Sequence, residues 1–216
     1  MASLSHRLAE RGLPSVRAQA AHPTVAGIAC GDLDPAVFRS WLEQDYLFLL
    51  DYVRVFARLA WQAPDGHLGD LVDLAHSTWH DELALHRSLA AEFDADLFGA
   101  VAAPATAAYT GFLLGAAEDY GRGLAALLPC MWGYSELGRA LAATGLPTES
   151  RYRRWIETYT DPGFADLAAW CAALLDRATG GLPAARLAAC ERAFLTSLRH
   201  ELAFWDAEEP DPWGKR

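Results

Sequence analysis

The sequence predicts an all-α protein, a helical bundle in a single domain. Isoleucine, which favours strands, occurs only at Ile28 and Ile156, whereas the strong helix formers Ala, Leu, Arg and Glu recur throughout. Apolar residues also recur at helical spacing along most of the chain. The 216 residues, 52% of them hydrophobic, suffice for one substantial core, and no repeat or long linker divides them. We therefore expect one domain over 1–216, with an acidic tail at about 208–216.

Three helices are expected in the first half of the chain. The first begins at Asp34-Pro35, a capping side chain followed by a first-turn proline, and its apolar positions continue to about Trp61. A turn at 63–66 ends it. Periodic apolar positions then predict helices over about 68–93 and 105–120. Gly121 to Gly123 are expected to form a kink or a short turn.

The second half is expected to hold the central helix of the bundle. Residues 124–141 are apolar on nearly every side, as in a buried helix, and Pro129 inside them should free one backbone carbonyl and kink the axis. Shorter helices follow at about 149–160 and 162–178, the latter beginning at a second Asp-Pro cap, Asp161-Pro162. The last helix is expected over about 184–207.

Charge and composition exclude several classes of function. The formal net charge is −10, and the only lysine is Lys215. A Schiff-base enzyme or a phosphate loop would need an interior lysine, and an acidic surface repels a nucleic-acid backbone. The four cysteines, at 30, 130, 171 and 190, have no C-x-x-C spacing and are expected to be reduced thiols.

The sequence also predicts a cytoplasmic location. Charged residues interrupt the apolar residues of positions 1–21, so this segment does not resemble a secretion signal. No later segment has about 18 uncharged apolar residues in a row, so no membrane span is expected.

Three residues stand out as candidates for chemistry. Cys130 directly follows the kinking proline, with Tyr134 one turn further on the same face; it is either a nucleophile or a small buried hydrophobe. Asp45 lies in an apolar run, where an acid needs a partner or a ligand unless it points to solvent. Glu201 borders an aromatic patch, and pairing with an arginine is its alternative role.

A metal site is not expected. His76, His80, Glu82 and His86 share one predicted helix, but at 100° per residue they cannot close around one ion. Glu82 and His86 form an i, i+4 pair of the kind that di-iron helical proteins use, although such sites need matching pairs from other helices. The simpler expectation is that Glu82 and His86 hold each other and the neighbouring helices in place.

Six sequence blocks, in order, resemble TenA-type thiaminase II proteins of the cysteine-containing branch, from His22-Pro23 to Trp205. The blocks are Gln44-Asp45-Tyr46; Glu82-Leu83-Ala84-Leu85-His86; Ala108-Tyr109-Thr110; Leu127-Leu128-Pro129-Cys130-Met131-Trp132; Tyr152 with Trp155-Ile156-Glu157-Thr158-Tyr159; and Glu201 with Phe204-Trp205. The resemblance implies a haem-oxygenase-like fold and a cytoplasmic homotetramer that hydrolyses aminopyrimidines without a metal or organic cofactor.

The resemblance also implies roles for individual residues. Cys130 corresponds to the nucleophile, Glu201 to the acid/base carboxylate and Asp45 to the acid that grips the aminopyrimidine. The remaining pocket positions are aromatic: Tyr109, Tyr134, Tyr159 and Phe204, with Phe48 where this branch commonly has a tyrosine. The implied reaction converts 4-amino-5-aminomethyl-2-methylpyrimidine to its hydroxymethyl form, and thiamin could be cleaved in the same way.

Elementary chemistry agrees with these roles. The exocyclic carbon is unreactive, but a thiolate that adds to the ring lets the ring electrons expel the amine, after which water replaces the amine and the thiolate leaves. Such a cycle needs a thiolate, a carboxyl group to move protons and an acid for the amidine edge. Two other hypotheses remain. The protein could be a di-iron oxidase that uses Glu82 and His86, or a TenA-like protein that acts as a regulator or that acts on or binds a different small amine.

Overall fold

The computed structural model describes residues 2–206, and residues 4–206 are almost entirely helical. No strand occurs in that range, so the all-α prediction is confirmed. The expected tail at 208–216, Lys215 and the last expected helical residue, 207, lie outside the described residues. The helices are α1 (Leu4–Ala20), α2 (Pro23–Cys30), α3 (Pro35–Gln62), α4 (Asp65–Ser77), α5 (Leu83–Glu92), α6 (Pro104–Ala116), α7 (Tyr120–Leu128), α8 (Tyr134–Ala142), α9 (Ser150–Thr160), α10 (Pro162–Thr179) and α11 (Ala184–Asp206).

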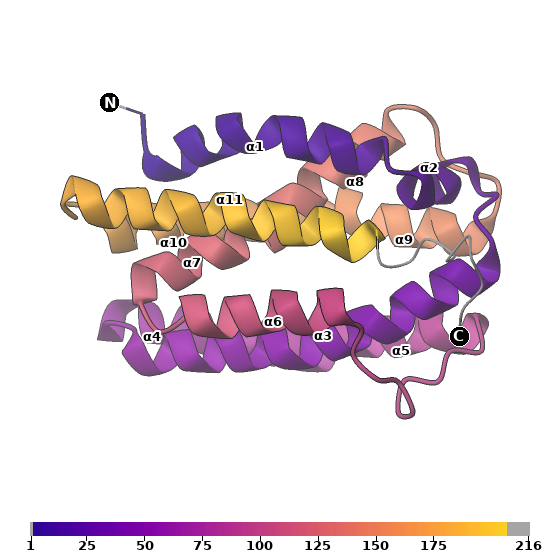
Figure 1. The fold of residues 1–216 in the computed structure, drawn as a ribbon, viewed down its shortest axis with the longest axis horizontal. Coiled ribbons are helices and arrows are strands. Elements are labelled where there is room, and N and C mark those ends of the chain that lie inside the picture. Colours follow the sequence, from indigo (N-terminus) through magenta and orange to yellow (C-terminus); the bar gives the residue numbers. More distant parts are fainter. Residues whose placement is uncertain (1, 207–216) are drawn as a thin grey trace.

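The last helix runs through the middle of the bundle. Helix α11 lies between α1 and α6 and also packs on α7, while α3 packs on α4 and α6 (Figure 1). Aromatic rings join these layers: Trp41 of α3 stacks on Trp205 of α11, with ring centroids 5.3 Å apart. Because α3, α6, α7 and α11 surround the centre of the molecule, side chains that they direct inward meet there. None of the helices in the described part has the length and apolar character needed to cross a bilayer.

Both predicted Asp-Pro caps are confirmed. The Asp34 side chain accepts a hydrogen bond from the backbone N–H of Ala36, and Asp161 accepts one from Gly163, each at 2.8 Å. These bonds satisfy N–H groups that the first helical turn leaves without a partner. They fix where α3 and α10 begin.

The two N-terminal helices were not predicted. Helix α1 buries only a narrow stripe, Leu4, Leu8, Gly12, Val16 and Gln19, between polar residues, so its apolar pattern is weak. Its capping residue, Ser3, accepts a hydrogen bond from the N–H of His6. Tertiary packing against α11 and α10, which the sequence pattern does not reveal, holds this helix in place.

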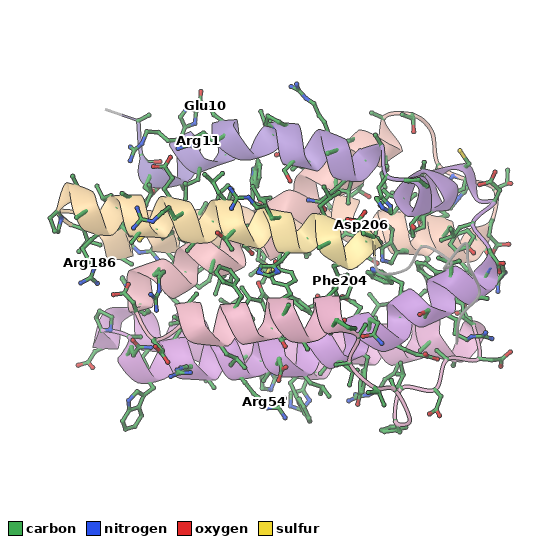
Figure 2. All side chains as sticks on the ribbon, in the orientation of Figure 1. Glu10, Arg11, Arg54, Arg186, Phe204 and Asp206 are labelled. Carbon is green, nitrogen blue, oxygen red and sulfur yellow. The ribbon has the colours of Figure 1, made fainter. Side chains whose placement is uncertain are left out.

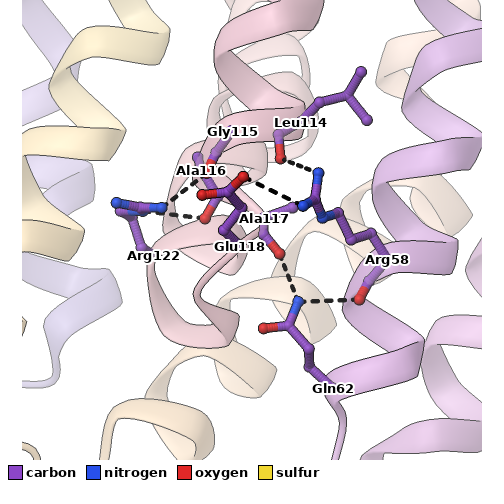
Figure 3. A network of polar contacts seen from close by, with 8 residues as sticks. All are labelled: Arg58, Gln62, Leu114, Gly115, Ala116, Ala117, Glu118 and Arg122. Atoms are coloured by element: carbon purple, nitrogen blue, oxygen red, sulfur yellow. Dashed lines mark hydrogen bonds and ion pairs between the residues drawn. The ribbon is translucent and has the colours of Figure 1, made fainter.

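Helix α6 ends at residue 116 rather than at 120, and side chains from both neighbouring helices hold its end (Figure 3). Arg58 and Gln62 of α3 donate to the carbonyls of Leu114 and Ala117, at 3.2 and 2.5 Å. Arg122 of α7 donates to those of Gly115 and Ala116, at 2.8 and 3.1 Å. The carbonyls that a helix end leaves unpaired are thus satisfied, and α6 is fixed to α3 and α7.

The expected break at Gly121 to Gly123 was wrong, because these residues lie inside α7. A Cβ added at Gly123 would come within 2.6 Å of Leu59 and 2.8 Å of the Ala117 backbone. The glycine is therefore needed for close helix packing rather than for a turn. The chain turns earlier, at residues 117–119, and Asp119 caps α7 through the N–H of Arg122.

Two π-helical turns interrupt helices that the sequence predicted as continuous. The turn η1 (Thr78–Glu82) divides the helix expected over 68–93, and η2 (Pro129–Gly133) divides the one expected over 124–141. The predicted distortion at Pro129 is confirmed, and the hydroxyl of Tyr52 donates to the carbonyl of Leu127, just before it, at 3.2 Å. No proline marks η1. Such turns are rare in proteins, but those that occur are often found at functional sites.

Candidate active site

All eight residues predicted from the resemblance line one pocket, here called the inner pocket, whose empty space of about 440 Å³ includes open solvent. They come from α3, α6, η2, α8, α9 and α11, which meet at the centre of the bundle. Phe204 lies on the side of α11 that faces α6 (Figure 2). The lining residues are Asp45, Phe48, Leu49, Tyr52, Glu82, Tyr109, Cys130, Met131, Tyr134, Tyr159, Glu201 and Phe204. The geometry is thus as expected, and the catalytic roles stay predictions.

The hydroxyl of Tyr109 connects the predicted nucleophile to the predicted acid/base. It donates to Glu201 Oε1 at 2.6 Å and lies 3.1 Å from Cys130 Sγ. It is also 2.8 Å from the Ser197 hydroxyl. A tyrosine hydroxyl has one proton, already used on Glu201, so the Ser197 hydroxyl donates to its oxygen, and the single proton of the Cys130 thiol goes either to Tyr109 or to Glu201. The thiol, the phenol and the carboxyl group therefore belong to one hydrogen-bonded network.

Burial makes Glu201 a base matched to neutral pH. Desolvation raises the pKa of Glu201 from 4.5 to about 7, against the opposing effect of hydrogen bonds from Tyr109 and Cys130. Burial, and then the nearby Glu201, raise the pKa of the Cys130 thiol well above its ordinary value. Cys130 is therefore a neutral thiol at pH 7, and it needs a base to become a nucleophile. Glu201, reached through Tyr109, is positioned to be that base.

Asp45 is held by His86 of α5. The Nε2 atom of His86 lies 2.6 Å from the carbonyl oxygen of Leu42, so it must carry a proton and donate. Its Nδ1 atom then faces Asp45 Oδ2 at 3.3 Å. Burial lowers the pKa of His86 to about 4, and burial, followed by Glu82 and Glu201, raises the pKa of Asp45. Both shifts favour the uncharged forms of the two groups.

The expectation that Glu82 and His86 hold each other was wrong. His86 contacts α3 through Leu42 and Asp45, while Glu82 is hydrogen-bonded to the Thr78 side chain within η1 and lines the inner pocket. Burial raises the pKa of Glu82 to about 7. Within residues 2–206, no three His, Cys, Asp or Glu side chains are grouped to hold a metal ion, so the di-iron hypothesis has no ligand set there.

Aromatic rings form the apolar wall of the inner pocket. Phe48 lies 5.0 Å from Tyr109 and 6.0 Å from Phe204, and Tyr134 lies 4.9 Å from Tyr159, measured between ring centroids. Gly138 of α8 makes room for Tyr159, because a Cβ there would come within 2.7 Å of the Tyr159 Cβ. These rings can stack on a flat heteroaromatic ligand, and the tyrosines add polar tips.

Sequence reasoning missed several residues of the site. Ser197 is hydrogen-bonded to Tyr109, and His86 lies 3.3 Å from Asp45. Glu82 lines the pocket, although only metal-binding and structural roles were predicted for it. Tyr52 lines the pocket as well, although no role was predicted for it. A search for polar residues one turn from each predicted site residue would have found Ser197, since it precedes Glu201 by four positions.

A second hollow, here called the outer chamber, adjoins the inner pocket and encloses about 1190 Å³, part of it open solvent. Asp45, Leu49, Glu82, Met131 and Tyr159 line both hollows, so the two hollows are adjacent. Beyond them the chamber extends along η1, α5, α9 and the start of α10.

Comparison with known proteins gives a consistent result. The model of the TENA/THI-4/PQQC family matches residues 11–209. An aminopyrimidine aminohydrolase of Halalkalibacterium halodurans is 36% identical over 94% of each chain. A TenA homologue from P. horikoshii OT3 has a TM-score of 0.88 at 24% identity, covering 96% of this chain and 98% of that one. A TenA family transcription regulator from Silicibacter sp. TM1040 has a TM-score of 0.87 at 27% identity, covering 97% and 98%.

Proposed function

The chain belongs to the TENA/THI-4/PQQC family, and on that premise we propose that it is an aminopyrimidine aminohydrolase of thiamin metabolism. The observation that carries this proposal is the contact of Cys130, Tyr109 and Glu201 in the inner pocket that Asp45 also lines. The substrate is 4-amino-5-aminomethyl-2-methylpyrimidine, and the products are ammonia and the hydroxymethylpyrimidine.

The substrate binds through its amidine edge and its ring faces. With Oδ2 turned toward His86, Asp45 presents Oδ1 as an acceptor for the 4-amino group. Phe48, Tyr109 and Phe204 supply aromatic surfaces for the ring. The ring is thereby held in the pocket that also contains the Cys130 sulfur.

The first half of the reaction expels the amine. The Glu201 carboxylate takes the proton of Tyr109 as Tyr109 takes that of Cys130, and the resulting thiolate adds to a ring carbon. The electron pair displaced within the ring breaks the exocyclic C–N bond. Glu201 returns its proton to the leaving nitrogen, and ammonia departs.

The second half adds water. Glu201, again a carboxylate, removes a proton from water as the oxygen bonds to the exocyclic carbon. The ring recovers its aromaticity as the C–S bond breaks, and the departing thiolate takes the proton back through Tyr109. Each residue ends the cycle as it began, and one water has replaced one ammonia.

Replacement of the sulfur tests the mechanism. In Cys130→Ser, ammonia release should fall to background, because a hydroxyl is far less acidic than a thiol, while pyrimidine binding by calorimetry should persist. Cys30→Ser, which changes an exposed thiol on α2, is the matched control and should keep full activity. Full turnover by Cys130→Ser would refute nucleophilic catalysis.

We further propose that the protein is a cytoplasmic homotetramer that does not bind nucleic acid and can also cleave thiamin. Exposed apolar side chains support self-association: Trp61, Leu68 and Val72, at the end of α3 and on α4, are 89%, 42% and 52% exposed. Light scattering should give a mass four times that of the chain. A monomer would refute the assembly but leave the chemistry intact.

A further inference from the structure

The outer chamber adjoins the inner pocket at Asp45, the residue proposed to bind the amidine edge of the substrate. Asp45 and Glu82 are among the five side chains that line both hollows. A pyrimidine ring placed between Asp45 and Cys130 occupies the inner pocket, so a bulky leaving group on its exocyclic carbon has to extend beyond this pocket. The adjoining chamber offers that space.

Within residues 2–206, the walls of the outer chamber have acidic side chains but no lysine or arginine. Among the described residues that line it, four are carboxylic acids, Asp45, Asp81, Glu82 and Asp161, and none is lysine or arginine. His86 is there too, but it donates to the carbonyl of Leu42 and faces Asp45. Nothing in the lining provides the planar guanidinium fork or the ammonium that proteins use to hold phosphate.

The rest of the lining is apolar and includes aromatic rings. Trp155 of α9 and Phe164 of α10 lie on the walls with Leu85 and Leu167. Phe164 packs edge-on against Tyr159, with ring centroids 5.2 Å apart, so the apolar wall continues up to the inner pocket. A flat heterocycle that carries a positive charge suits such a surface, because rings favour cations and the carboxylates add attraction.

We propose that the outer chamber binds the leaving group of the substrate and selects cationic, unphosphorylated leaving groups over phosphorylated ones. Thiamin, whose cleavage is part of the proposed function, has such a leaving group, a cationic nitrogen heterocycle. This inference rests on the proposed function, and it adds a second binding site and an excluded class. A phosphate, with a charge of about −1.5 to −2, would meet the carboxylates of Asp81 and Asp161 and no cationic partner in the described lining, while burial favours the protonated forms of Asp45 and Glu82.

The test compares three substrates on the unmodified enzyme: aminomethylpyrimidine, thiamin and thiamin monophosphate. We expect kcat/KM for thiamin to exceed that for its monophosphate at least about tenfold, with the ratio falling as salt screens the charges. Equal values for the two would overturn the inference, and so would the absence of thiamin cleavage. Failure to hydrolyse aminomethylpyrimidine would instead refute the proposed function.

Substitutions in the chamber test whether its lining causes the selectivity against thiamin monophosphate. Asp81→Arg places a cation on the wall and should raise the monophosphate-to-thiamin ratio of kcat/KM about tenfold. Asp166→Arg makes the same charge change on α10 at an exposed residue that does not line the chamber, and it should shift the ratio less than threefold. Equal shifts in the two variants would show that net charge, not the chamber, selects the substrate.

A change of volume provides an independent test. Leu167→Trp narrows the chamber and should lower kcat/KM for thiamin at least about tenfold relative to aminomethylpyrimidine. Because both substrates share the inner pocket, a misfolded variant would lose both activities together, and circular dichroism and the melting temperature would report it. An unchanged ratio in a folded variant would contradict the placement of the leaving group.

Discussion

The two π-helical turns differ in what they bring to the inner pocket. The turn η2 carries Cys130, which contacts Tyr109 and thereby Glu201, whereas η1 carries Glu82, whose side-chain partner is Thr78 of the same turn. Both turns place an ionisable side chain on the pocket wall. Irregular helix geometry thus exposes a reactive group, but hydrogen-bonded neighbours decide whether the group can exchange protons.

Glu201 and Glu82 sharpen this comparison, because burial raises the pKa of each to about 7. If the contact with Tyr109 allows Glu201 to act as the catalytic base, Glu201→Gln should lower kcat/KM about 10²- to 10⁴-fold. In the unmodified enzyme kcat/KM should rise with pH through about 7 as Glu201 ionises, and the variant should lose that rise. A pH–rate profile measures both effects.

Glu82→Gln is the matched control for that experiment. It removes a carboxyl of similar pKa from the same pocket without touching the Tyr109 contact, so the pH-dependent rise near 7 should remain. A rise that survived in Glu201→Gln and vanished in Glu82→Gln would reverse the assignment of the base.

His86 is expected to have the next largest effect, through Asp45. The glutamine in His86→Gln can still donate to the Leu42 carbonyl but has no Nδ1 atom. Asp45 therefore loses the contact that orients its carboxyl group. Loss of this buried polar contact should raise KM about 10- to 100-fold and lower kcat much less. Steady-state kinetics gives this split, and a loss confined to kcat would contradict a positioning role. His86→Asn, which mimics Nδ1 instead, should restore part of the affinity.

The buried Glu82 carboxyl group is expected to lower the stability of the folded protein as pH rises, and to have little effect on activity. Its pKa in the folded protein, about 7, lies above the ordinary 4.5, so the folded state binds the proton more tightly and stability falls as pH rises from about 4.5 to 7. Glu82→Gln should therefore raise the free energy of unfolding by about 1–3 kcal/mol at pH 8, relative to its effect at pH 4.5. Urea denaturation at the two pH values measures the difference, and an equal change at both would contradict it.

Pro129→Ala should have the smallest effect. The turn η1 forms without a proline, so η2 should also persist without one, held by Tyr52 on the Leu127 carbonyl and by the surrounding core. We expect kcat to change less than about threefold, because Pro129 itself provides no reacting group. A large loss of kcat in a folded variant would show that proline imposes the position of Cys130.

The sequence predicted what depends on local pattern. The Asp34 and Asp161 caps, the helices after residue 34 and the distortion at Pro129 follow from side-chain chemistry and spacing, and resemblance brought the eight pocket residues together. The pairing of His86 with Asp45 could not be predicted in this way. Helical arithmetic assumes 100° per residue, and η1, which no proline announces, changes the register of everything that follows it.

The π-turns also make the pocket sensitive to the length of the chain. A π-turn contains one residue more than the α-helical turn that it replaces, so deleting one residue from η2 would leave a regular helix. That helix would turn α8 by about 100° relative to α7 and carry Tyr134 off the pocket wall. Single-residue insertions and deletions at these two places can therefore rebuild the pocket while the bundle around it keeps its topology.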